Sequence, residues 1–213
     1  MTQRDAELAG SLAAAYTAFA ATFRGPRPAF WNRMTLTGLS LGTLALALEP
    51  RARQLRVRGR DVATGLASAA ALYGIFRIGD RMARRIMPSG ASDIDSVYDL
   101  RTLGDRAAIA ARLAAVIGPA EEIFWRGFVQ RRLADRFETY QGAALAAAAY
   151  GGAHVVTLNP TLVGAATVAG AFWSGLSAAG ASLGALIVSH AAWDVLIFLV
   201  APTTPKDPRT VAP

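Results

Sequence analysis

Two adjacent glutamates and an arginine, Glu121, Glu122 and Arg126, lie inside an otherwise apolar stretch of the sequence at residues 117–127. Charges in apolar surroundings are unfavourable unless they are paired or used for chemistry. Successive residues of a helix point about 100° apart, so the two carboxylates cannot share one direction. Glu122 and Arg126 are spaced i,i+4 and can form an ion pair. The spacing therefore predicts that Glu122 is structural and that Glu121, which has no local partner, is available for chemistry.

The two histidines of the chain, His154 and His190, both fall in its apolar second half. Asp194 follows His190 by four residues, which places the imidazole and the carboxylate on one helix face. Taken singly, each histidine is more often a hydrogen-bonded core residue than a catalytic one. However, three separate apolar segments each supply ionisable side chains, and such groups in a bilayer normally face the bundle interior or a wet cavity. We therefore expect these groups and Glu121 to converge on one polar cavity.

The composition indicates a membrane protein. Of the 213 residues, 53% are hydrophobic and 17% are charged, whereas soluble domains carry roughly 25% charged residues. The net charge of +7 comes from arginines that flank apolar runs, where they can face anionic lipid. No nucleic-acid motif accompanies them, so we expect no nucleic-acid partner. The absence of cysteine excludes disulfides and thiol catalysis.

The elements that must position these groups form an all-α, polytopic transmembrane bundle of about six spans with an N-terminal interfacial helix. The predicted spans are residues 30–48, 62–78, 107–129, 142–158, 161–178 and 182–200. Ahead of them, apolar residues recur every three or four positions, which is typical of an interfacial helix; they are Leu8, Leu12, Tyr16, Phe19 and Phe23. We divide the chain into an amphipathic segment (1–33), two transmembrane helices with a polar loop (34–106), a core that carries the motifs (107–201) and a polar tail (202–213).

The ionisable residues of the core fall in three ordered motifs: Glu121-Glu122-Ile-Phe-Trp-Arg126, Tyr150-Gly-Gly-Ala-His154 and His190-Ala-Ala-Trp-Asp194. In this order they resemble the motifs of the CPBP (Abi) family, which contains the CAAX prenyl endopeptidases and bacterial proteins linked to bacteriocin processing or self-immunity. The resemblance covers about residues 107–200. Tyr150 stands where that family usually has phenylalanine, and Asp194 stands where the endopeptidases have asparagine. An ionised aspartate cannot donate a hydrogen bond to an oxyanion as asparagine can, so Asp194 would have to be protonated or to orient His190.

The resemblance implies glutamate-dependent peptide hydrolysis inside the membrane. Glu121 and His154 would hold and activate a water molecule, with Glu121 as the general base, and His190 with Asp194 would stabilise the oxyanion. The residues expected to support this site are Glu122, Arg126 and Tyr150. No cofactor is implied. The expected partners are membrane lipids and a peptide or membrane-anchored protein substrate, and the expected location is the bacterial cytoplasmic membrane.

Other classes of protein fit part of the pattern. Two histidines with one or two carboxylates are suitable zinc ligands, which would suit a metal-dependent membrane protease, although no His-Glu-x-x-His motif is present. A non-catalytic immunity or binding protein of the same fold would keep the cavity but tolerate loss of Glu121. A transporter would be favoured by inverted repeats, and the sequence shows none.

Overall fold

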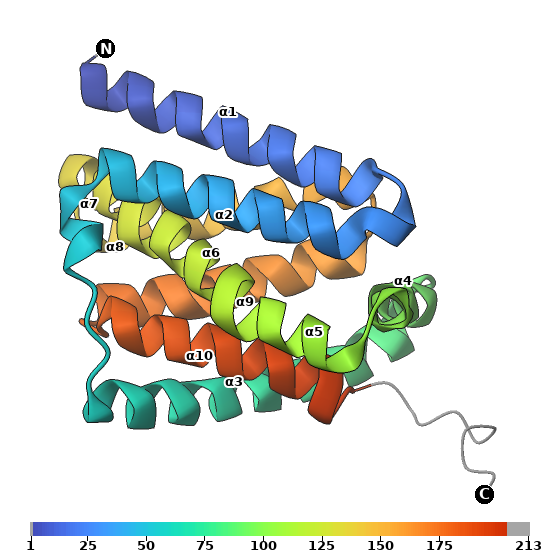
Figure 1. Ribbon diagram of the computed structural model, residues 1–213. Helices are drawn as coiled ribbons and strands as arrows, with labels where there is room; N and C mark the ends of the chain where they lie inside the picture. The colour runs from blue at the N-terminus through green and yellow to red at the C-terminus, as the bar shows by residue number, and fades with distance from the viewer. Residues whose placement is uncertain (1, 204–213) are drawn as a thin grey trace, which may run out of the picture.

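A computed structural model describes residues 2–203, and every regular element in that range is helical (Figure 1). The α-helices are α1 (Gln3–Arg24), α2 (Phe30–Leu48), α3 (Gly59–Ile86), α4 (Gly90–Tyr98), α5 (Arg106–Arg112), α6 (Gly118–Phe124), α7 (Arg131–Phe137), α8 (Thr139–Ala153), α9 (Pro160–Ala178) and α10 (Leu183–Val195). Three π-helical segments continue them: Leu113–Ile117, Trp125–Gln130 and Leu196–Val200. The predicted all-α bundle is confirmed, and the part of the predicted tail beyond residue 203 lies outside the described residues.

The segment that carries the glutamates is one helical rod, in which α5, α6 and α7 are joined by two of the π-helical segments. Pro119 lies at the start of α6. Because proline has no N–H, the ordinary i to i−4 hydrogen bond cannot form there, and a π-helical turn precedes it. Turns of this kind are frequent at functional sites. The rod continues to Phe137, beyond residue 129, where the predicted span ends.

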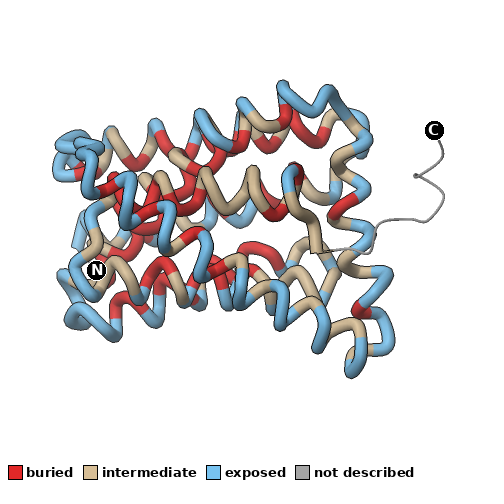
Figure 2. The backbone as a smooth tube through the Cα atoms, turned by 90° about the horizontal axis from the view of Figure 1, so that it is seen from below, coloured by how far each residue is buried: buried red, intermediate tan, exposed pale blue. Residues whose placement is uncertain are grey.

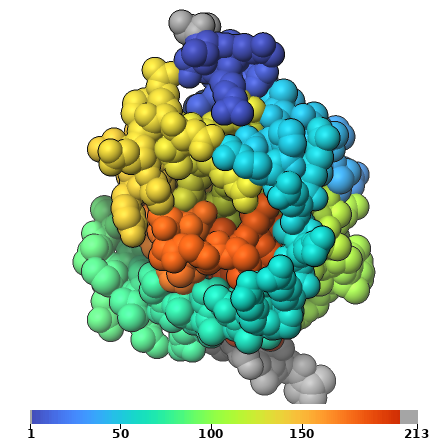
Figure 3. Space-filling model, turned by 90° about the vertical axis from the view of Figure 1, so that its left-hand side faces the viewer, coloured from blue at the N-terminus to red at the C-terminus, as the bar shows by residue number. Residues whose placement is uncertain are grey.

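The helices pack with their long axes roughly aligned, and α4 is seen end-on across one end of the bundle (Figure 1). α6 contacts α2 on one side and α10 on the other, α10 packs along α3, and α8 packs along α9. Figure 2 shows the buried residues gathered on the inward side of the helices. In Figure 3, which views the opposite end from α4, atoms of α10 lie at the centre of the end face, surrounded by earlier parts of the chain. The core is therefore built around α6 and α10, the two helices that carry the first and third motifs.

Two of the helices that enclose the site begin at side-chain caps. Asn159 accepts a hydrogen bond from the Leu162 N–H at 2.7 Å, and Pro160 follows as the first residue of α9. Ser182 accepts one from the Ala185 N–H at 3.0 Å and so starts α10. Such caps satisfy N–H groups that the helix itself leaves free. They set where along each helix the later side chains lie.

The second motif lies at the end of a helix and not inside one. The prediction of a span over 142–158 was wrong at its end, because α8 finishes at Ala153 and a 3₁₀ turn follows at Val155–Thr157. Leu158 then adopts a left-handed backbone with φ of 55°. The chain must turn here because α9 begins at Pro160, and His154 therefore caps α8.

Within residues 2–203, three helical stretches are long and apolar enough to cross a membrane: Gly59–Ile86, Pro160–Ala178 and Leu183–Val200. α3 runs beyond the predicted span 62–78, since it continues through several arginines to Ile86. It also exposes large apolar side chains along its length, namely Val62, Leu66, Ile75, Ile78, Met82 and Ile86. Exposed apolar side chains in this number suit a lipid environment better than water.

The N-terminal helix α1 lies lengthwise beside α2 (Figure 1). Leu8 and Phe19 of the predicted apolar stripe are buried, and Leu12 and Phe23 pack against the same core. Tyr16 is more exposed, and its hydroxyl donates to the Ala149 carbonyl of α8 at 3.2 Å. The amphipathic pattern is therefore confirmed, and the interfacial placement of this helix stays a prediction.

Candidate active site

A buried carboxylate, that of Glu122, joins the first and third motifs. Its Oε1 accepts hydrogen bonds from Arg126 Nη1 at 3.0 Å and from His190 Nδ1 at 2.7 Å. The predicted i,i+4 ion pair is present. Arg126 also donates from Nη2 to the Gly170 carbonyl on α9 at 3.0 Å. This approach suits glycine, since a Cβ at position 170 would lie 3.0 Å from the Tyr150 ring.

Glu121 has a partner from another helix. The Tyr150 hydroxyl donates to Glu121 Oε2 at 2.9 Å. The carbonyl of the same tyrosine lies 2.9 Å from His154 Nδ1. A carbonyl can only accept, so Nδ1 carries the proton in this contact and the Nε2 of a neutral imidazole is left as an acceptor. Tyr150 therefore holds both the candidate base and the imidazole beside it.

Asp194 lies close to His190 without a hydrogen bond to it. The distance from His190 Nε2 to Asp194 Oδ2 is 3.7 Å, which is longer than a hydrogen bond. The carboxylate in hydrogen-bond contact with His190 is that of Glu122, to which the sequence assigned only an ion pair. His190 thus lies between two carboxylates, one bonded to Nδ1 and one near Nε2.

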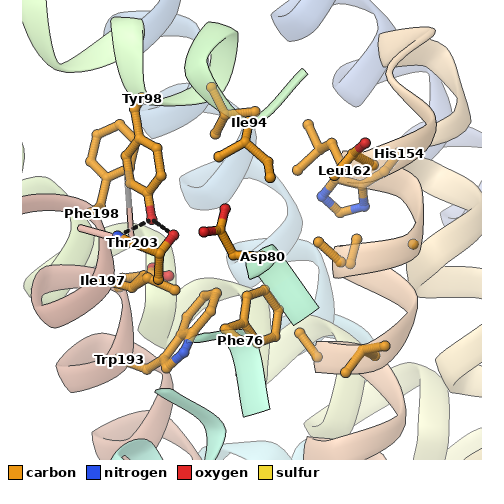
Figure 4. A pocket seen from close by; sticks show the side chains of 18 of the residues that line it. Phe76, Asp80, Ile94, Tyr98, His154, Leu162, Trp193, Ile197, Phe198 and Thr203 are labelled. Atoms are coloured by element: carbon orange, nitrogen blue, oxygen red, sulfur yellow. Dashed lines mark hydrogen bonds between the residues drawn. The ribbon is translucent and has the colours of Figure 1, made fainter. Parts of the chain in front are cut away.

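Five of the candidate residues face one cavity of about 490 Å³. Its walls are mostly apolar, and the site residues that reach it are Glu121, Tyr150, His154, His190 and Asp194. Figure 4 shows His154 beside Leu162 on one side of the cavity, with Tyr98 and Phe198 on the other. Among the lining residues neither Glu122 nor Arg126 is found. The structure therefore brings the predicted residues together and separates those that face the cavity from those behind it.

Several residues near the site were not found from the sequence. The Trp173 ring stacks on the His190 imidazole, with ring centroids 3.9 Å apart, and its N–H donates to Ser189 Oγ at 3.0 Å. From the N-terminal helix, Phe19 and Phe23 contact the His154 ring. None of these lies in a charged or polar motif, so hydropathy and spacing predicted no more than packing for them.

The part of the chain that the structure describes contains no group of three or more His, Cys, Asp or Glu side chains placed to hold a metal ion. Apart from Asp194, the candidate residues form two hydrogen-bonded sets, Glu121–Tyr150–His154 and Arg126–Glu122–His190.

Fold and site together define a helical membrane bundle in which the carboxyl groups of Glu121 and Asp194 and two histidines face a mostly apolar cavity. Residues 104–196 match the family described as type II CAAX prenyl endopeptidase Rce1-like. The match confirms the family resemblance of the three motifs, and it covers less than half of the chain. Together with the apolar helices, it indicates an integral membrane protein similar to CAAX-type membrane endopeptidases. No curated protein and no solved structure matches the chain.

Proposed function

We propose that this protein is a glutamate-dependent endopeptidase of the bacterial cytoplasmic membrane that cleaves a membrane-associated peptide or protein. The observation that supports this most is the shared opening of Glu121 and His154 onto one cavity, with Tyr150 bonded to both. A carboxylate and a neutral imidazole that face the same space can both bind one water molecule. A water held in this way is the nucleophile that peptide hydrolysis needs.

In the proposed reaction, Glu121 acts as the general base and His154 orients the water through Nε2. Glu121 takes one proton from the water as its oxygen attacks the carbonyl carbon of the scissile peptide. The tetrahedral intermediate then collapses, the C–N bond breaks, and the proton held by Glu121 passes to the leaving amine. The products are a new carboxyl terminus and a new amino terminus, and Glu121 is regenerated.

The oxyanion of the intermediate requires hydrogen-bond donors. His190 is suited to this role because Glu122 holds its Nδ1, which leaves Nε2 as the ring nitrogen nearest to Asp194. We assign the oxyanion to the Nε2–H of His190 in its imidazolium form, in which both ring nitrogens carry a proton, with a protonated Asp194 as a second donor. Glu122 and Arg126 support His190 from behind the cavity.

The walls of the cavity favour an apolar substrate. Most of the lining is aromatic or aliphatic, including Phe23, Phe30, Trp31 and Met34 from the first two helices. Lipid tails are as apolar as these side chains, so an apolar peptide segment can pass from the membrane into the cavity with little change in its solvation. We therefore propose a membrane-anchored or membrane-associated peptide as the substrate class.

The test compares native peptide termini in membranes from cells that express wild type, Glu121→Gln or Glu138→Gln at equal level. Glutamine keeps an oxygen that accepts from Tyr150 but cannot take a proton from water. Glu138 is an exposed glutamate whose side chain forms no hydrogen bond or ion pair with the described residues, so it provides a matched control. We expect wild type and Glu138→Gln to produce the same new termini at similar rates. With Glu121→Gln the rate at which these termini form should fall by a factor of roughly 10²–10⁴.

Identical termini in all three membranes, with all three proteins stably inserted, would contradict the proposal. The result would favour a non-catalytic binding or immunity protein in which Glu121 is a structural charge. If the termini are lost with Glu138→Gln as well as with Glu121→Gln, replacement of a glutamate disturbs the protein in general. This result would also count against a specific role for Glu121.

A further inference from the structure

The imidazole of His190 packs face to face on an indole ring. The centroids of the Trp173 and His190 rings are 3.9 Å apart and their planes differ by 19°. Both side chains are buried. The hydrogen bond from Nδ1 to Glu122 fixes one atom of the imidazole, but it leaves the ring free to tilt about that atom. A flat ring stacked at contact distance removes this remaining freedom.

The indole is itself fixed to the helix that carries His190. Its Nε1–H donates to Ser189 Oγ at 3.0 Å, and Ser189 is the residue directly before His190 on α10. An indole N–H is only a donor, so the serine oxygen must be the acceptor. Trp173 comes from α9, and this bond therefore fixes α9 relative to α10 next to the imidazole.

Trp173 also contacts the other end of the buried network. The guanidinium carbon of Arg126 lies 5.5 Å from the centroid of the Trp173 ring, within the range of a cation–π interaction. Arg126 donates to the same Glu122 oxygen that holds His190. The indole thus contacts both groups that Glu122 joins.

From these contacts we infer that Trp173 and Ser189 are positioning residues that set the plane of the His190 imidazole and thereby aim its Nε2 into the cavity. Neither acts on the substrate directly. Their meaning for catalysis rests on the proposed function, whereas their effect on the imidazole does not.

The first experiment observes the ring directly. Because the chain has two histidines, the full-length protein labelled with ¹⁵N-histidine in detergent micelles gives two sets of imidazole signals, which a His154→Gln variant assigns. The variants are Ser189→Ala, which removes the acceptor, Trp173→Phe, which keeps a ring but removes the N–H, and Trp173→Leu, which removes the ring. The matched control is Ser174→Ala: Ser174 is a buried serine beside Trp173, and its Oγ has no hydrogen-bond partner among the described residues.

We expect the His190 Nδ1–H signal to exchange faster with water in Ser189→Ala and Trp173→Phe, and most in Trp173→Leu. His154 signals stay in place, and Ser174→Ala leaves both histidines unchanged. The second experiment measures the initial rate at which wild-type-specific peptide termini form in membranes. We expect falls of about 3–10-fold for Ser189→Ala and about 100-fold for Trp173→Leu, as misplacement of a reacting group by about 1 Å can have such an effect.

His190 signals that are identical in wild type, Ser189→Ala and Trp173→Phe would overturn the inference. These two conservative variants keep the test decisive even if Trp173→Leu does not fold. Equal changes in Ser174→Ala would also overturn it, because they would show a general response to loss of a buried hydroxyl. If wild type produces no termini of its own but the His190 signals respond as expected, the proposed function fails and the positioning of the imidazole stands.

Discussion

Two buried arginine–glutamate pairs, both with their arginine on the same helical rod, differ in how completely they are satisfied. Near one end of the bundle, Glu49 accepts from Arg132 at 3.1 Å and from Arg51 at 2.7 Å. Arg132 also donates to the Leu48 carbonyl and contacts Glu7 of α1. In the centre of the bundle, by contrast, the pair of Arg126 and Glu122 leaves Arg126 Nε and Glu122 Oε2 without a hydrogen-bond partner among the described residues.

The difference separates a structural network from a functional one. The outer pair joins α1, the end of α2 and α7 through redundant contacts, so each charge keeps a partner if one is lost. In the central pair, Arg126 and His190 both donate to the same oxygen of Glu122, so loss of Arg126 leaves that carboxylate with only the imidazole as a partner among the described residues. Buried polar networks that are only partly satisfied are unfavourable for stability. We interpret the central arrangement as one retained because His190 requires it.

The largest loss of stability is expected from Arg126→Met. Removal of one partner leaves the Glu122 charge buried, which typically destabilises a protein by about 3–5 kcal/mol. The double variant Glu122→Gln/Arg126→Met should recover part of this loss, since no charge is then left unpaired. Denaturant unfolding in micelles measures the free energy of unfolding of the single and the double variant. A loss below about 1 kcal/mol for Arg126→Met would show that the two pairs do not differ as proposed.

A smaller loss of stability is expected from Arg132→Met. The variant loses the hydrogen bonds that Arg132 makes, but Glu49 keeps its contacts with Arg51, so its charge is not left isolated. We expect the free energy of unfolding to fall by about 1–3 kcal/mol. The same unfolding measurement compares it with Arg126→Met. An Arg132→Met protein that is less stable than Arg126→Met would reverse the assignment of the two networks.

Asp194→Asn should leave the stability unchanged and should not slow the reaction. The His190–Asp194 contact is longer than a hydrogen bond, so little stability depends on it. The amide of asparagine donates to an oxyanion whatever the pH, and we expect cleavage at the wild-type rate or up to about tenfold faster. The measurement compares the rate at which new peptide termini form in membranes that contain Asp194→Asn or wild type. A fall of tenfold or more would mean that the reaction needs the carboxyl group of Asp194.

The smallest effect is expected in the pH dependence of the outer network. Burial alone would raise the pKa of Glu49, but hydrogen bonds and charges from Arg51 and Arg132 outweigh it and lower the pKa from 4.5 to about 2. A lowered carboxyl pKa stabilises the folded state above the unfolded value, and this stability is lost as the pH falls from about 4.5 to about 2. Glu49→Gln should remove that part of the acid sensitivity. Parallel unfolding curves for wild type and Glu49→Gln across this range would contradict the role of Glu49.

Much of the site was predictable because its motifs are local. The i,i+4 spacing of Glu122 and Arg126 allowed an ion pair to be predicted, and the pair is present. The burial of His154 and His190 followed from their apolar surroundings. The same spacing rule placed Asp194 on the His190 face, but a residue 68 positions away in the chain, Glu122, makes the closer contact.

The sequence by itself determined the helical class, the apolar segments and the three ordered motifs, because composition and helical periodicity are properties of neighbouring residues. Only the tertiary structure decided that Tyr150 bonds to Glu121, that Glu122 holds His190 and that Trp173 stacks on the imidazole. These contacts depend on how each helix is rotated and shifted against its neighbours. Such rotations follow from packing across the whole bundle, which no local spacing encodes.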